Sequence, residues 1–166
     1  MNYHLRLTRG QVQNAEGLDL LRLALWQGEP HKGGTELDHV TTVSGQPGRQ
    51  FFRLGADSIP GSMEPIPQGE YALGAPDWAG APGDWGVSWN DGLGPVVIDV
   101  DELTPGQTRR GDLRIHCDWN EDRAPGSAGC ITVQGKTGPR DLDRMKRVLS
   151  WFATYQPKRL TVDWGL

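Results

Sequence analysis

The residues with the clearest chemical potential lie in one stretch of the chain, Ile115–Ile131. His116 ends a strand-like run, a polar loop rich in Pro and Gly follows, and Cys130 opens the next apolar run. A thiol attacks a carbonyl carbon only as the thiolate, and a neighbouring imidazole can take its proton. The pattern therefore predicts Cys130 as a nucleophile and His116 as its base, provided that the loop folds back and brings the two strands together.

The residues around this pair suggest how the site would work. Gly129 has no Cβ, so the backbone can turn sharply before Cys130, and the amides of both residues can then point at a developing oxyanion. Ser127 is either a hydrogen-bonding residue of that oxyanion region or a turn residue. The imidazole also needs an acceptor at its other nitrogen, for which a backbone carbonyl near Cys117 and the side chain of Asp118 are the candidates.

Cys117 leaves two further alternatives open. It could pair with Cys130 in a disulfide, which would block catalysis until it is reduced. It could also join His116, Cys130 and Asp118 in a zinc site, although neighbouring strand residues point to opposite faces and fit tetrahedral coordination poorly. We expect neither a metal nor another cofactor. The remaining histidines show no ligand spacing: His4, His31 and His39.

Short apolar or alternating runs predict the strands that must position these residues. They cover 3–8, 18–26, 40–43, 69–73, 95–100, 113–115, 130–133 and 160–164. One segment differs, because from Asp141 to Tyr155 the apolar residues recur every three or four positions, which is typical of an amphipathic helix. Gly138-Pro139 suits its start and Gln156-Pro157 its end. The chain is thus expected to be a mainly β domain with one amphipathic helix near the C-terminus.

Composition and charge narrow the functional classes. A length of 166 residues suggests one domain over 1–166, and 23 Gly with 12 Pro suit many short strands joined by tight turns. The net charge of −4 and the lack of a basic stripe argue against nucleic-acid binding. No apolar stretch approaches a membrane span. No apolar run follows the basic start at Met1–Arg6, so we expect synthesis in the cytoplasm without a signal peptide.

The motif resembles the active-site signature of the L,D-transpeptidase catalytic domain. His116 matches the strand-end histidine of that family, and Ser127, Gly129, Cys130 and Ile131 match its second element. Upstream, two segments are similar to the Ser-Gly turn and the Thr-Pro-x-Gly-x-Phe/Tyr segment of the family: Val43-Ser44-Gly45 and Pro65–Tyr71. The similar order of elements covers 18–133.

Several positions depart from the family pattern. Ala128 replaces the second histidine, Cys117 the glycine after the first, and Thr132 an arginine two residues beyond the nucleophile. The loop between His116 and Cys130 is also short. A reduced motif of this kind is similar to divergent members among phage lysis proteins and interbacterial toxins, which act on peptidoglycan without a standard signal peptide.

The resemblance implies an L,D-transpeptidase-like β-sandwich or barrel acting on the peptidoglycan stem peptide. Cys130 would form a thioester with the residue before D-Ala, and water or an amine would then give L,D-carboxypeptidase or transpeptidase action. The site of action would be the periplasm or cell wall after delivery, with an immunity or delivery protein as partner. Arg123, and after it Arg114, would bind substrate carboxylates. Apart from the resemblance, Trp119 is either a platform for the substrate or a packing residue.

Two readings from other classes remain. The first is a non-catalytic peptidoglycan- or glycan-binding β-domain that uses the Trp-rich segment 75–95, with Trp78, Trp85 and Trp89, as a groove. The second is a cysteine peptidase or acyltransferase that acts on protein substrates.

Overall fold

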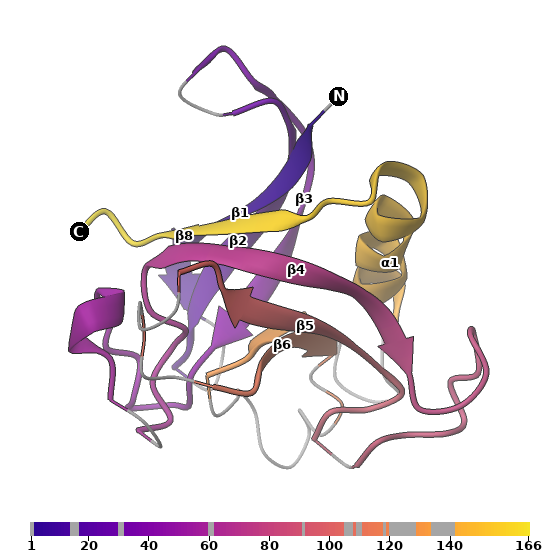
Figure 1. Ribbon diagram of the computed structural model, residues 1–166. Helices are drawn as coiled ribbons and strands as arrows, with labels where there is room; N and C mark the ends of the chain where they lie inside the picture. The colour runs from indigo at the N-terminus through magenta and orange to yellow at the C-terminus, as the bar shows by residue number, and fades with distance from the viewer. Residues whose placement is uncertain are drawn as a thin grey trace.

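Eight strands close into a barrel in the part of the chain that the structure, a computed structural model, describes (Figure 1). The described residues are 2–13, 17–29, 32–59, 62–90, 92–104, 108, 111–117, 119, 129–133 and 142–166. The strands are β1 (Tyr3–Gln13), β2 (Asp19–Gln27), β3 (Thr35–Ser44), β4 (Gly69–Trp78), β5 (Val96–Glu102), β6 (Leu113–Cys117), β7 (Ile131–Val133) and β8 (Arg159–Asp163). The expectation of a mainly β fold is confirmed.

The order of the strands around the barrel is β1-β2-β3-β7-β6-β5-β4-β8. Most neighbours are antiparallel, but β6 pairs with β7 and β1 pairs with β8 in parallel. This order makes neighbours of the strand that carries His116 and the strand that follows Cys130. It also places β8 on the far side of the barrel from β7.

The interior of the barrel is filled by apolar side chains that alternate along the strands, as the period-two runs predicted. Opposite pairs such as Leu7 with Leu23 are fully buried, and the polar residues between them face outward. The buried cluster includes Leu5, Leu7, Leu23, Leu25, Ile98, Val100, Ile115, Ile131, Val133, Leu160 and Val162. Alternation thus assigns one face of each strand to the core.

The helix α1 (Asp143–Tyr155) packs against β3 and β4 at the side of the barrel (Figure 1). Trp151 donates its indole N–H to Asp38 Oδ2 on β3 at 2.9 Å, and Gln156 ends the helix in a left-handed conformation. The predicted helix is confirmed from residue 143 onward, whereas Gly138-Pro139 and Asp141 lie outside the described residues. Four side chains bury its apolar face: Met145, Val148, Trp151 and Phe152.

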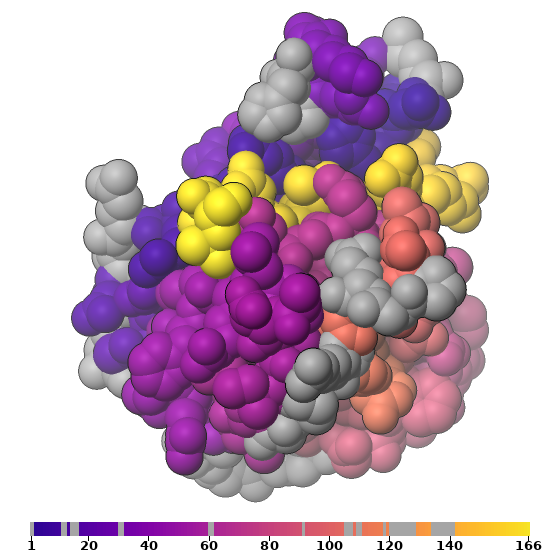
Figure 2. Space-filling view, turned by 60° about the vertical axis from the view of Figure 1, so that its left-hand side comes forward, coloured from indigo at the N-terminus to yellow at the C-terminus, as the bar shows by residue number. Residues whose placement is uncertain are grey.

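The connection between β3 and β4 is fastened to the barrel and to the C-terminal end of the chain (Figure 2). Gly45 has a φ of 87°, and a Cβ there would lie 2.9 Å from Pro65, so this turn requires glycine. Gln68 Oε1 accepts hydrogen bonds from the backbone N–H of Trp164 and of Leu166. These contacts hold the chain around Gln68 in place directly before β4 begins at Gly69.

No helix in the described ranges combines the length and the apolar character that crossing a membrane requires.

Candidate functional site

The parallel pairing of β6 and β7 decides which side chains share a face. Ile115 lies opposite Ile131, and both point into the apolar interior. His116 lies opposite Thr132, so these two side chains point to the other face of the sheet. Although this is not the face that lines the barrel interior, both side chains are buried, and His116 is only 5% exposed.

Cys130 comes directly before β7, two residues ahead of Thr132, and so extends the face that carries His116. With ordinary strand spacings, its Cα lies about 8 Å along the diagonal from that of His116, a separation that an imidazole and a thiol can bridge. Cys130 is partly exposed and donates its thiol to the backbone carbonyl of Asp112 at 3.6 Å. The two candidate residues for nucleophilic catalysis therefore lie on one face, His116 on β6 and Cys130 at the start of β7, and Cys130 is partly exposed.

The imidazole of His116 is oriented by the next residue along the chain. Its Nδ1 lies 2.8 Å from the carbonyl oxygen of Cys117, which can only accept, so Nδ1 carries the proton. Burial is the main reason why the pKa of His116 is lowered to about 4; the bond to the Cys117 carbonyl acts in the opposite direction, and the positive charge of Arg114 adds a smaller lowering. At neutral pH the ring is therefore uncharged, with its lone pair on Nε2, as a general base requires. Of the two proposed orienting groups, the structure thus shows the carbonyl; Asp118 lies outside the described residues.

The side chain of Ser44, at the end of β3, forms hydrogen bonds with two segments that are distant in the sequence, at Gly129 and at Ile66. Its hydroxyl donates to the carbonyl oxygen of Gly129 at 2.9 Å and accepts the backbone N–H of Ile66 at the same distance. Ser44 is fully buried. Gly129 itself has a φ of 120°, a conformation that favours glycine, in agreement with the turn expected there. Ser44 therefore sets the position of Gly129, the residue before Cys130.

We expect Ser44→Ala to lower the free energy of unfolding by about 1–3 kcal/mol, because it leaves a buried N–H and a buried C=O without their partner. Urea unfolding measures this change. Thr42→Val is the matched control, two residues earlier on β3, because the Thr42 hydroxyl is buried without a partner among the described residues. Its loss should be neutral or stabilising. Equal destabilisation by the two variants would contradict the role given to Ser44.

Arg114 lies on the same face as His116 and is already engaged by acidic groups. Its guanidinium forms an ion pair with Asp99 at 3.2 Å and lies 3.8 Å from the carboxylate of Asp112. It also donates to the carbonyl oxygen of Asp112 at 3.4 Å. Arg114, expected to bind substrate carboxylates, thus has two carboxylate neighbours within the protein.

The side chain of Cys117 does not belong to the site. It is 2% exposed and lies within the apolar core, on the opposite face of β6 from His116. Cys117, expected among the catalytic residues, thus faces His116 with its carbonyl group and has its thiol in the apolar core. Neither cysteine forms a disulfide, and the described residues contain no group of three or more His, Cys, Asp or Glu that could hold a metal ion.

The aromatic residues near the site divide into packed and exposed ones. Trp119 is half-buried, and its ring lies so close to Gly94 that a Cβ there would approach it to 3.1 Å. Trp78 and Trp85 pack edge to face with ring centroids 5.1 Å apart. Trp89 remains 47% exposed. Of the predicted groove residues, Trp89 thus offers the most surface to a ligand.

Three of the predicted site residues lie outside the described part of the chain: Ser127, Arg123 and Asp118. Two residues that the structure adds are Ser44 and Asp112. The Val43-Ser44-Gly45 motif marks the position of Ser44 in the sequence but does not reveal its hydrogen bonds. Asp112 acts through its backbone carbonyl and has a φ of 54°, and neither feature has a signature in its residue type.

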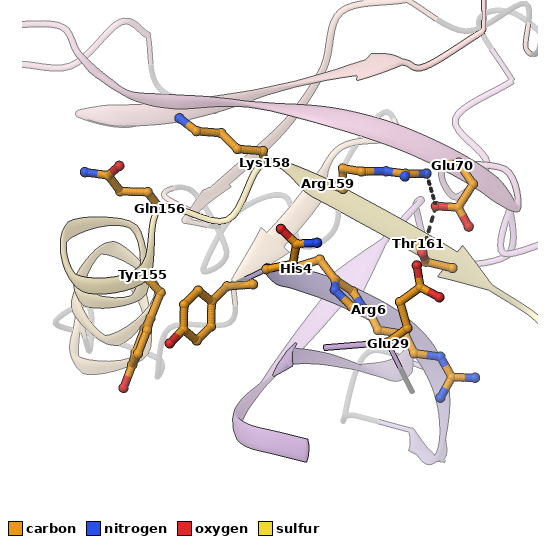
Figure 3. Close-up of a pocket in the computed structure, with 11 residues that line it drawn as sticks. His4, Arg6, Glu29, Glu70, Tyr155, Gln156, Lys158, Arg159 and Thr161 are labelled. Carbon is orange, nitrogen blue, oxygen red and sulfur yellow. Dashed lines mark hydrogen bonds and ion pairs between the residues drawn. The ribbon is translucent and has the colours of Figure 1, made fainter. Parts of the chain in front are cut away.

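A polar pocket of about 380 Å³ opens on the far side of the barrel, over β1, β8 and β4 (Figure 3). Glu70 accepts the Thr161 hydroxyl at 2.8 Å and pairs with Arg159 at 3.5 Å. Burial lowers the pKa of His4, with Arg159 acting in the same direction against Glu29 and Glu70. Tyr3 and Tyr155 line one end, with ring centroids 4.7 Å apart. Neither His116 nor Cys130 lines this pocket, so it is a separate feature.

Comparison of the chain with protein-family models, with curated proteins and with solved structures finds no match.

Proposed function

We propose that this chain is a cysteine enzyme that acts on peptidoglycan stem peptides, as an L,D-transpeptidase or L,D-carboxypeptidase. The observation that carries the proposal is the orientation of His116. Its Nδ1 donates to the carbonyl of Cys117, which leaves the lone pair on Nε2, on the face of the sheet that Cys130 extends. A neutral base on the same face as a partly exposed cysteine suits acyl transfer through a thiolate.

The reaction would proceed in two halves. His116 Nε2 takes the thiol proton as Cys130 Sγ bonds to the carbonyl carbon before the terminal D-Ala, and the carbonyl oxygen becomes an oxyanion. The carbon–nitrogen bond then breaks, the imidazolium returns its proton to the leaving amine, and a thioester and D-Ala result. Water or an acceptor amine attacks the thioester, His116 takes a proton from it, and this proton returns to the sulfur. Because His116 is buried, the imidazolium is costly and passes its proton on quickly.

The substrate class follows from the resemblance and not from the geometry. The acyl donor would be the bond after meso-diaminopimelate in a tetrapeptide stem, with Arg123 as the first candidate for its free carboxylates. The protein would reach the periplasm or cell wall by delivery, and a delivery or immunity protein would be its partner. Exclusion of water from the site would decide between hydrolysis and transfer.

Mass spectrometry of muropeptides tests the proposal. Wild-type protein incubated with tetrapeptide muropeptides should remove one D-Ala, or exchange it for an added D-amino acid, and its intact mass should show an acyl adduct on Cys130. The Cys130→Ala variant should give neither product nor adduct. Muropeptides with a tripeptide stem lack the scissile bond and serve as the substrate control. Unchanged turnover by Cys130→Ala would refute the proposal.

A second candidate is a non-catalytic peptidoglycan-binding domain, which the polar pocket on the far side of the barrel favours. Its tyrosines, charged groups and volume suit a short polar ligand, and neither catalytic candidate lines it. This candidate predicts that the protein sediments with insoluble peptidoglycan, releases no products and leaves Cys130 unreactive. A cysteine peptidase or acyltransferase would instead act on protein substrates in a substrate panel.

A further inference from the structure

The guanidinium group of Arg114 and the thiol of Cys130 share one hydrogen-bond acceptor. Arg114 Nη1 donates to the carbonyl oxygen of Asp112 at 3.4 Å, and Cys130 Sγ donates to the same oxygen at 3.6 Å. The strand register is consistent with this shared acceptor. Ile115 lies opposite Ile131 in the parallel pair, so the residues directly before them, Arg114 and Cys130, lie opposite each other if the pairing continues by one residue. The guanidinium group and the thiol therefore both approach the Asp112 carbonyl oxygen, from residues on one face of the sheet.

The imidazole is a poor source of positive charge at this site. His116 is 5% exposed, and burial lowers its pKa to about 4, so it is uncharged at neutral pH. His116 thus supplies no resting positive charge to a thiolate that forms at Cys130. Arg114 keeps its charge at every accessible pH and is 29% exposed, so its guanidinium supplies a permanent cation.

We propose that Arg114 is a positioning residue that stabilises the thiolate form of Cys130, while His116 supplies only the proton acceptor. The inference rests on the proposed function in treating Cys130 as the nucleophile. In the resting protein the thiol donates to the carbonyl of Asp112. Once the proton has left, the sulfur can only accept, so the carbonyl oxygen repels it and the guanidinium N–H groups attract it.

The other charged groups on this side of the sheet determine how strongly Arg114 stabilises the Cys130 thiolate. Asp99 on β5 pairs with Arg114 at 3.2 Å, and the Asp112 carboxylate lies 3.8 Å from it. Asp101 follows two residues after Asp99 on the outward face of β5. The described parts of β7 and of β3 beside it, Ile131–Val133 and Thr42–Ser44, carry no titratable side chain. Removing Asp99 should therefore strengthen the attraction between Arg114 and the Cys130 thiolate, whereas removing Arg114 should abolish this attraction.

The pH dependence of Cys130 alkylation by iodoacetamide tests this assignment, with peptide mapping to separate Cys130 from the buried Cys117. We expect Arg114→Gln to raise the midpoint of the rate–pH curve by about one pH unit and to slow alkylation at pH 7 about tenfold. Arg114→Lys keeps the charge and should stay within about threefold of wild type. Asp99→Asn should lower the midpoint. Arg159→Gln, which removes a cation on β8 across the barrel, is the matched control and should leave the midpoint unchanged.

Three results would overturn the inference: equal midpoints for Arg114→Gln and Arg159→Gln, equally slow alkylation of the Gln and Lys variants, or a raised midpoint for Asp99→Asn. Circular dichroism confirms that each variant is folded. Alkylation requires no peptidoglycan, so the predicted shifts would support the role of Arg114 even if muropeptides were not turned over. Turnover of muropeptides with an unshifted midpoint would retain the proposed function and refute this inference.

Discussion

A His116→Asn variant is expected to turn over tetrapeptide muropeptides about 10²–10⁴-fold more slowly than wild type, since it lacks a general base. The asparagine amide N–H can replace Nδ1 as the donor to the carbonyl of Cys117, so the local hydrogen bond is kept. The amide oxygen is not basic enough to take the place of Nε2, so the variant lacks the proposed base. Initial rates of D-Ala release, measured by mass spectrometry, give the comparison.

His39→Asn is the matched control for this prediction. His39 lies on β3 with half of its side chain exposed, and it should keep the wild-type rate when changed. Because the pKa of His116 is about 4, the rate of wild type should fall on the acid side near pH 4 and not near the ordinary histidine value of 6.5. An acid limb near pH 6.5, or wild-type turnover by His116→Asn, would contradict the role of His116 as a buried neutral base.

The second large effect concerns stability in acid. The pKa of His116 is lowered from 6.5 to about 4 by burial, so between these values the unfolded chain binds a proton that the folded protein does not. The contribution of the neutral imidazole is complete above about pH 6.5 and is lost as the pH falls towards 4. A shift of this size corresponds to a loss of about 3 kcal/mol in the free energy of unfolding.

Urea unfolding at pH 7 and at pH 4.5 measures this loss, and His116→Asn should remove most of the difference between the two pH values. Burial also lowers the pKa of His4, which acts in the same direction, so wild type and variant must be compared at each pH. The His39→Asn variant should retain the full acid sensitivity. The explanation fails if His116→Asn loses as much stability in acid as wild type does.

The alternation of apolar residues was sufficient to locate the strands but not all of their ends. The prediction for β3 began at Val40, whereas the strand begins at Thr35. Its first five residues are partly or fully exposed, and four of them are polar, so they carry no apolar period, and pairing with β2 extends the strand over them. Likewise β4 continues beyond Leu73 because the register shift between Leu73 and Pro76 keeps it paired with β5.

For the site, residue types pointed to His116, Cys130 and Gly129, because a base, a thiol and a flexible turn have chemical signatures in the sequence. The orienting carbonyl of Cys117 was one of two alternatives, and the structure was needed to choose it. The roles of Ser44 and of the Asp112 carbonyl come from hydrogen bonds between segments distant in the sequence. Backbone acceptors occur at every residue, so no residue type marks them.

The sequence by itself determined the strand and helix types, the inward faces of the strands and the pair of residues proposed for acyl transfer. These features are local, because side-chain periodicity and chemical type can be read within a few residues. Only the tertiary structure decided that β6 lies parallel to β7 in a closed barrel, which sets His116, Cys130 and Arg114 on one face and buries the Cys117 thiol on the other. The period of a strand defines its two faces but not its neighbour, which is selected by how all eight strands together bury their apolar sides.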